Sequence, residues 1–170
     1  YRKYTGMEDI YANESNGFRS LRGAYNAELF LKSGFTTIKD IGNDGNYATA
    51  DVIKAIRQGW VKGPTIFYSG KIIAPYGGQT SGINPDNELL WNYEFLDADT
   101  PDEMVKAIRK NIYFGANCIK IVTGDQQYFY SEEDIKLAVR EAHRAGVKLT
   151  CHVFDGEAPK NAIMGGPVAI

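Results

Sequence analysis

The sequence predicts an α/β protein of parallel strand–helix units, arranged as an open doubly wound sheet or as part of a TIM-type (β/α)8 barrel. Runs rich in β-branched residues alternate with segments of helical apolar periodicity four times along the chain. In addition, Gly34, Gly115 and Gly146 each stand between a predicted helix and the strand that follows it. A complete barrel takes about 250 residues, so we expect these 170 residues to hold only part of one.

The first half of the chain is expected to contain two strand–helix units after an irregular start. Residues 1–17 are polar and aperiodic, which predicts a loop. Helices are predicted over 18–32 and 49–60, and strands over 35–41 and 65–69. The first helix is expected to bury one apolar face, made of Leu21, Ala24, Ala27 and Leu31.

The second half begins with a long segment, residues 72–99, that we expect to be a loop. A loop of this length in a compact domain is usually functional when it is ordered. A helix is predicted to start at Thr100, because Pro101 and Glu103 complete the pattern of a capping box. Two further units follow, with strands at about 117–123 and 148–153 and helices over 131–145 and 158–164.

Composition excludes some classes of partner. The net charge of −2 provides no basic field for nucleic acid or anionic membrane. No apolar run approaches the roughly 20 residues that span a bilayer, so no membrane contact is expected. The chain opens with Tyr1 and not with Met, which suggests a piece of a longer polypeptide. The compartment is therefore left open, cytoplasmic by default, because a signal peptide could lie upstream.

Two predicted strands carry residues that need an explanation. Lys120 lies within an apolar strand, although burying an ammonium group costs several kcal/mol unless it is paired or neutralised. His152 lies near the end of the next strand. Alternation places Lys120 and Val122 on one face of their strand, and Thr150 and His152 on one face of theirs. If the strands are parallel neighbours, Lys120 and His152 point into one cavity.

A buried strand lysine has two chemically sensible roles. Burial lowers the pKa of its amine, which can then form a Schiff base with a carbonyl substrate. Alternatively, the neutral amine can capture CO2 and become a carbamate that ligates metal. The presence of His152 favours the second role, because histidine is the commonest metal ligand in such sites.

Several segments resemble the amidohydrolase superfamily, nearest to its imidazolonepropionase-like and Xaa-Pro or Xaa-Arg dipeptidase-like branch. Residues 34–42 resemble the G-x-T-T-x-x-D-x-G element, and residues 63–70 the G-P-x-x-x-x-S-G strand. Residues 115–121 resemble G-A-D-x-I-K, and residues 141–152 resemble E-A-H-x-x-G-x-x-x-x-x-H. The stretch from 162 to 166 resembles the approach to a second metal-binding histidine. The match runs from about residue 21 to the end.

The resemblance implies that residues 1–170 form one partial metal-dependent hydrolase barrel, roughly strands 2–5 with their helices. Lys120 would be the catalytic, carbamylated lysine (carboxylysine) that bridges metals, and His152 would be a second metal ligand. One or two divalent ions, zinc by default, would activate a hydroxide that cleaves an amide-type C–N bond. The other ligands of that family would lie outside the 170 residues, so the piece alone is expected to be inactive.

Three residues near strand ends are expected to contact substrate, namely Tyr76, Gln79 and Phe154. Gln79 stands where many members of the family have a histidine, and Phe154 also departs from their pattern. The substrate would be a small molecule such as a dipeptide, an N-acyl amino acid or a cyclic amide. The rest of the same polypeptide is an expected partner, and a homo-oligomer is also expected.

Two other functions stay open. The Ile119–Gly124 run also resembles the Schiff-base strand of deoxyribose-phosphate aldolase, which would make Lys120 a class I aldolase lysine. However, the phosphate loop of that family has no counterpart after His152. A non-catalytic protein with the amidohydrolase fold, used for assembly, is the third hypothesis, and Gln79 favours it slightly.

Overall fold

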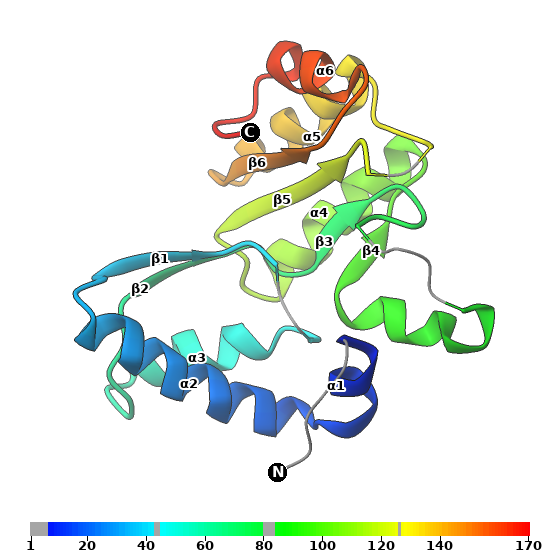
Figure 1. The fold of residues 1–170 in the computed structure, drawn as a ribbon. Helices are drawn as coiled ribbons and strands as arrows, with labels where there is room; N and C mark the ends of the chain where they lie inside the picture. The colour runs from blue at the N-terminus through cyan, green and yellow to red at the C-terminus, as the bar shows by residue number, and fades with distance from the viewer. Residues whose placement is uncertain (1–6, 43–44, 80–83, 126) are drawn as a thin grey trace.

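A computed structural model describes residues 7–42, 45–79, 84–125 and 127–170 (Figure 1). The helices are α1 (Met7–Asn13), α2 (Asn16–Lys32), α3 (Ala48–Arg57), the 3-10 helix η1 (Pro85–Tyr93), α4 (Pro101–Tyr113), α5 (Glu132–Arg144) and α6 (Ala158–Gly165). The strands are β1 (Thr37–Asp40), β2 (Thr65–Tyr68), β3 (Ile72–Ala74), β4 (Phe95–Asp97), β5 (Cys118–Thr123) and β6 (Lys148–Val153).

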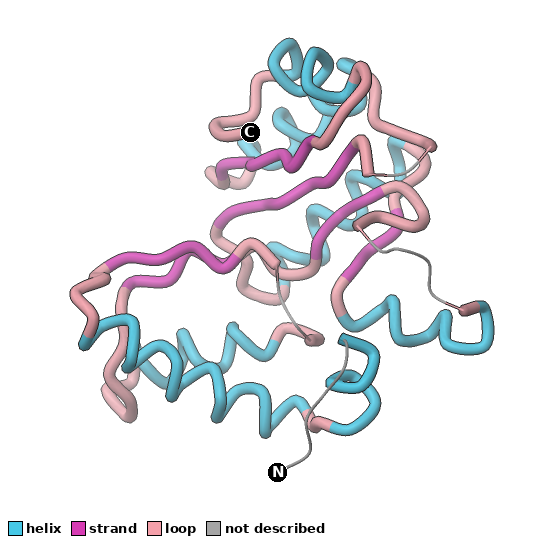
Figure 2. The backbone as a smooth tube through the Cα atoms, viewed as in Figure 1, coloured by secondary structure: helices cyan, strands magenta, loops and turns pink. Residues whose placement is uncertain are grey.

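The described strands pair in parallel throughout, as the sequence predicts. Strands β1 and β2 form one pair, and a second sheet has the order β4-β3-β5-β6. Helices α2 and α3 lie along the β1–β2 pair, whereas α4 and α5 lie behind the four-stranded sheet (Figures 1 and 2). The expected α/β class of successive strand–helix units is therefore confirmed.

One long strand is broken between β2 and β3, and the side chains of buried Asn111 and half-buried Asn117 support the break. Gly70 has a φ of +72°, and a side chain there would lie 2.6 Å from Asn111 Oδ1. The Asn111 side chain accepts from the Lys71 amide at 3.1 Å and donates to its carbonyl at 2.7 Å. Asn117, just before β5, accepts from the Tyr68 amide at 2.7 Å. These bonds replace sheet pairing at the break and link the two sheets.

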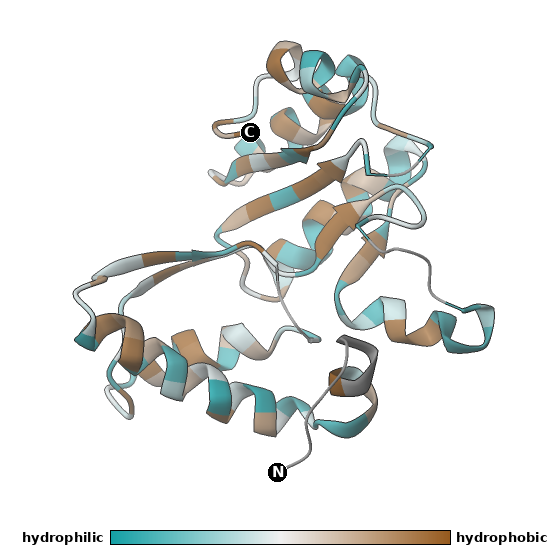
Figure 3. Ribbon diagram, viewed as in Figure 1, coloured by the Kyte–Doolittle hydropathy of each residue, from teal (hydrophilic) through white to brown (hydrophobic). Residues whose placement is uncertain are grey.

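The main core lies between the four-stranded sheet and α4 and α5. Ile119, Ile121 and Leu149 are fully buried there, against Ile108 and Ile135 of the two helices. A smaller apolar cluster occupies the opposite face of the sheet and consists of Ile72, Ala74, Trp91, Phe95 and Val122. Figure 3 shows that the central strands are predominantly hydrophobic. Burial on both faces is typical of a parallel sheet.

Local start and stop signals explain the positions of α4 and α5. Thr100 and Ser131 each close a capping box, with Glu103 and Asp134 as the respective partners. Glycines 34, 115 and 146 have φ values of +93°, +95° and +70°, so each ends its helix in a left-handed conformation. The predicted positions of these helix boundaries are confirmed.

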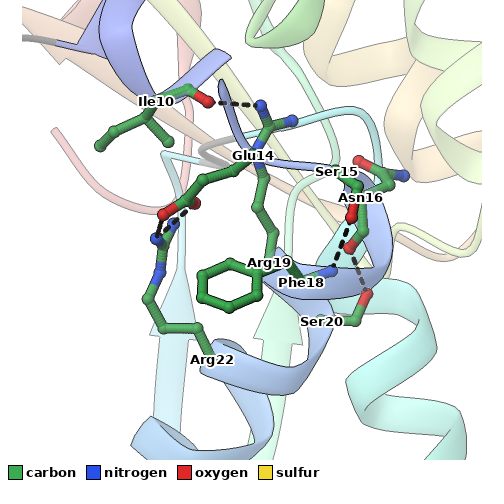
Figure 4. A network of polar contacts seen from close by, with 8 residues as sticks. All are labelled: Ile10, Glu14, Ser15, Asn16, Phe18, Arg19, Ser20 and Arg22. Atoms are coloured by element: carbon green, nitrogen blue, oxygen red, sulfur yellow. Dashed lines mark hydrogen bonds and ion pairs between the residues drawn. The ribbon is translucent and has the colours of Figure 1, made fainter. Parts of the chain in front are cut away.

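The expectation of a loop over residues 1–17 is wrong for the part that is described, because Met7–Asn13 form α1; residues 1–6 lie outside the description. Arg19 of α2 is buried, lies 5.4 Å from the Tyr11 ring and 5.1 Å from the Tyr93 ring, and donates to the Ile10 carbonyl. Figure 4 shows this guanidinium beside the Glu14–Arg22 ion pair. A tertiary contact, and not periodicity, fixes α1.

The expected loop over residues 72–99 is also largely ordered. It contains β3, η1 and β4, while residues 80–83 lie outside the description. The segment is held by Trp91, whose ring stacks on Phe95 at 4.1 Å and whose Nε1 donates to Asp97 at 2.5 Å. Short elements of three residues carry too little periodicity to be recognised in a sequence.

The predicted apolar face of α2 is only partly correct. Ala27 is buried, but Leu21 is 72% exposed. Among the described helices, none combines the length and apolar character needed to cross a bilayer.

Candidate active site

Strand β5 places Lys120 on the sheet face opposite the main core. Its neighbour Ile121 packs into that core, so alternation turns Lys120 and Val122 to the other face. Lys120 is only 8% exposed. Burial lowers the pKa of its amine, while the negative charges of Glu94, Asp125 and Asp40 oppose that shift. A lysine in this position has a larger neutral fraction than a solvated one.

Gln79 contacts the lysine directly. Lys120 Nζ donates to Gln79 Oε1 at 3.1 Å. Gln79 follows the carboxyl end of β3, and β3 is the strand that pairs with β5 through Ile73 and Ile121. The predicted substrate residue therefore touches the predicted catalytic residue.

His152 lies on the neighbouring strand β6, on the face that strand alternation predicts for it. In the parallel register, Thr150 pairs with Lys120 and His152 pairs with Val122. His152 is thus on the same face as Lys120, two residues or about 6.6 Å further toward the carboxyl end of the sheet. The expectation that the two strands are parallel neighbours is confirmed.

Asp125 joins this pair from the loop after β5. Its Oδ2 lies 3.3 Å from His152 Nε2, and its side chain is only 15% exposed. Within the part of the chain that the structure describes, this buried oxygen accepts no well-formed hydrogen bond. A carboxylate oxygen that has lone pairs to spare and lies beside an imidazole can orient the ring or bind a cation.

The loops after β5 and β6 are locked together at Gly124. This glycine has a φ of +94°, and a side chain there would lie 2.8 Å from the Ala158 Cβ and 3.4 Å from the Phe154 amide. Close approach of the two loops brings Asp125 to His152. Only glycine combines this conformation with so little space.

The other two predicted substrate residues lie on exposed loops. Tyr76 follows β3 and is 57% exposed, with its hydroxyl donating to Glu88 at 3.0 Å and its amide donating to Asp99 at 3.1 Å. Phe154 follows β6 and is 74% exposed. Both flank the carboxyl ends of the strands that carry the site. Their exposed aromatic surfaces are available to a ligand.

Glu94 is a residue of the site that sequence reasoning missed. Among the charges that raise the pKa of Lys120 against the effect of burial, that of Glu94 has the largest effect. Tyr11 of α1 donates a hydrogen bond to the Glu94 carboxylate. Glu94 lies between η1 and β4, in the segment that we expected to be a loop. No motif or period marks it, because only the folding of that segment brings it near β5.

The residues present suit a divalent metal in part. Across the described ranges, no three His, Cys, Asp or Glu side chains converge in a way that could hold a metal ion. A carbamate on Lys120 would add the oxygen ligand that this count omits, beside a His152 ring and the open Oδ2 of Asp125. Carboxylate and imidazole ligands together are typical of hydrolytic zinc sites. The chemistry of this donor set therefore fits such an ion.

No protein-family model matches the chain. Among curated proteins, the ochratoxinase of Aspergillus niger is 28% identical over 194 aligned residues, which cover 95% of this chain and 39% of that protein. The crystal structure of A. niger ochratoxinase superposes with a TM-score of 0.83 at 24% identity, over 98% of this chain and 43% of that one.

Two further solved structures are similar at 26% identity and a TM-score of 0.77. One is an amidohydrolase, with 95% of this chain and 42% of that chain covered. The other is a Xaa-Pro dipeptidase with methionine bound in its active site, with 90% and 40% covered. The chain thus spans about two fifths of the length of the relatives that it matches.

These strands and helices are part of a TIM-type barrel of the kind found in hydrolases. More specifically, its relatives include an ochratoxinase, an amidohydrolase and a Xaa-Pro dipeptidase, which is consistent with a fragment of an amidohydrolase-superfamily protein.

Proposed function

We propose that the protein carrying this chain is a metal-dependent hydrolase that cleaves an amide-type C–N bond in a small molecule. Residues 1–170 would supply roughly strands 2–5 of its barrel. The observation that carries the proposal is the placement of Lys120 and His152 on one face of adjacent parallel strands. Active sites of such barrels form at the carboxyl ends of the strands, and His152 lies toward that end. The amide-hydrolysing relatives support the reaction class.

Lys120 would enter the site as a carbamate. Its neutral amine attacks CO2, a new N–C bond forms, and one amine proton leaves to solvent, so the product is a lysine carbamate anion. Burial favours the neutral amine from which this reaction starts. The carbamate converts a cationic side chain into an anionic oxygen ligand. This conversion also removes the cost of a buried ammonium group.

His152 and Asp125 would complete the metal-facing surface of this part of the barrel. If Asp125 accepts the proton on Nε2, the Nδ1 nitrogen of His152 is left as the lone-pair donor. A divalent ion held there, zinc by default, would lower the pKa of water and polarise the scissile carbonyl. Tyr76 and Phe154 would contact the substrate at the mouth and exclude bulk water from it.

Metal analysis of the full-length protein tests the proposal. We expect one or two equivalents of divalent metal by plasma mass spectrometry, falling at least tenfold in Lys120→Ala and in His152→Ala. The chain has one other histidine, His143, which is exposed in the last turn of α5, and His143→Ala should keep its metal. Equal metal content in all three variants would reject the proposed ligands.

The aldolase alternative has its own readout. Reduction with borohydride in the presence of an aldehyde would trap an imine on Lys120 if this lysine is a Schiff-base former. A metal-free protein that gives such an adduct, lost in Lys120→Ala, would replace the hydrolase proposal. A metal-free protein without an adduct would favour the assembly role.

A further inference from the structure

Gln79 lies in direct contact with Lys120, the lysine that the proposed function turns into a carbamate. Lys120 Nζ donates to Gln79 Oε1 at 3.1 Å. The donor is a nitrogen that has no acceptor capacity when protonated, so the amide oxygen is the group that faces it. The amide nitrogen of Gln79 therefore points away from the lysine.

The loop that carries Gln79 is fixed by several contacts. Gly78 has a φ of +37°, its amide donates to the Pro75 carbonyl at 3.0 Å, and a side chain there would lie 2.6 Å from Trp91. Tyr76 is anchored through Asp99 and Glu88, as described above. Gln79 is itself exposed, but the residue before it, Gly78, lies close against buried Trp91. The amide is thus presented to Lys120 by a preformed turn.

We propose that Gln79 is a positioning residue that holds the nitrogen of Lys120 both before and after CO2 adds to it. This inference rests on the proposed function. When the amine attacks CO2, the N–C bond forms and one proton leaves, but the carbamate nitrogen keeps one hydrogen. Gln79 Oε1 can accept that hydrogen. Because a carbamate is planar, fixing its N–H direction also fixes the direction of its two oxygens.

A neutral acceptor is the side chain that this role requires. Methionine has similar length but only a weakly accepting sulfur. Glutamate would accept from an ammonium group, but its negative charge would repel a carbamate anion. The two substitutions therefore separate the loss of the hydrogen bond from the addition of charge. If this exposed side chain had only a structural role, the methionine and glutamate variants would not differ in carbamate occupancy.

The experiment measures carbamate directly by 13C NMR on the full-length protein, with excess zinc, at one fixed pH and increasing 13C-bicarbonate. The Lys120→Ala variant identifies the carbamate resonance by its absence. In Gln79→Met we expect the bicarbonate concentration for half-occupancy to rise about tenfold, because the single N–H of the planar carbamate loses its acceptor and cannot turn to another, whereas the free amine can rotate. Gln79→Glu should raise it further. The matched control is Gln58→Met, at the exposed end of α3, which should behave as wild type.

The outcomes distinguish the role of Gln79 from the proposed function. A wild-type carbamate that is unchanged in folded Gln79→Met and Gln79→Glu would overturn the role of Gln79 and leave the proposed function standing. Absence of any Lys120-dependent carbamate in wild type would overturn both. Thermal melts of each variant show that it is folded. If Gln79→Met does not fold, the Gln79→Glu titration alone decides.

Discussion

His152 Nε2 lies 3.3 Å from Asp125 Oδ2, across the carboxyl ends of β5 and β6. The contact joins a residue that the sequence marked as a ligand to one in the loop that follows β5. Such a carboxylate fixes which nitrogen of a histidine carries the proton and how the ring is oriented. Asp125 is therefore expected to tune the site through His152.

We predict that Asp125→Asn lowers zinc affinity about 10- to 100-fold without a comparable loss of stability. The amide cannot accept the ring proton in the same way and carries no charge. Competition with a chromophoric chelator measures the affinity in the full-length protein. The control is Asp155→Asn, on the exposed loop after β6, which should bind zinc as wild type does. Equal losses in both variants would assign the effect to general electrostatics.

Gly124 should be far less tolerant of a side chain than Gly146. Both have positive φ values, +94° and +70°, but only Gly124 faces a close neighbour, the Ala158 Cβ at 2.8 Å. Backbone strain of about 1 kcal/mol is expected in both alanine variants, and overpacking adds about 1–3 kcal/mol in Gly124→Ala alone. Urea denaturation compares the two. Equal free energies of unfolding would mean that the loops after β5 and β6 move apart at little cost.

Lys71 is expected to make the free energy of unfolding depend on pH in the alkaline range. This lysine is buried at the break between β2 and β3, donates to the Asn92 carbonyl, and lies 5.3 Å from the Tyr47 ring. Burial lowers its pKa from 10.5 to about 8, with Lys110 adding repulsion. Because the folded-state pKa is the lower one, the unfolded chain binds more protons between these two values. The cost that this buried charge imposes on folding therefore falls, and the free energy of unfolding rises, as pH increases from about 8 to 10.5.

The comparison with Lys71→Met isolates that effect. The free energy of unfolding of wild type, relative to Lys71→Met, should increase by up to about 3 kcal/mol between pH 8 and pH 10.5. Denaturant titrations at several pH values measure the difference, in which contributions common to both proteins cancel. A difference that is flat with pH would show that the buried amine is as well solvated in the folded protein as in the unfolded chain.

The 170-residue chain expressed alone is expected to self-associate. Helix α2 exposes an apolar stripe at helical spacing, formed by Phe18, Leu21, Tyr25 and Leu29. Contiguous exposed apolar surface promotes association in water. Analytical ultracentrifugation should show oligomers that Leu21→Glu combined with Tyr25→Glu reduces. The control is Leu89→Glu, at a similarly exposed leucine of η1. A monodisperse wild-type monomer would contradict the prediction.

Local signals were sufficient for much of the fold. The capping box at Thr100, the helix start at Ser131 and the helix-ending glycines 34, 115 and 146 lie where the sequence predicts them. The pairing of Lys120 and His152 on one face also follows from strand alternation once the two strands are parallel neighbours. These features depend on residues a few positions apart, so a linear pattern records them.

Other features were decided only by the tertiary structure. Helix α1 lacks a periodic pattern and is held by Arg19 packing against Tyr11 and Tyr93. Likewise β3 and β4, with three residues each, are too short to show a period, and Trp91 of η1 contacts Phe95 and Asp97 of β4.

The candidate site shows the same division. Sequence patterns alone place a lysine and a histidine on consecutive strands, and strand alternation assigns each of them to a face of its strand. Only the tertiary structure brought Gln79, Glu94 and Asp125 to them, from loops whose paths are set by close contacts at Gly78 and Gly124. Contacts between residues distant in sequence depend on packing in three dimensions, and no short-range pattern encodes them.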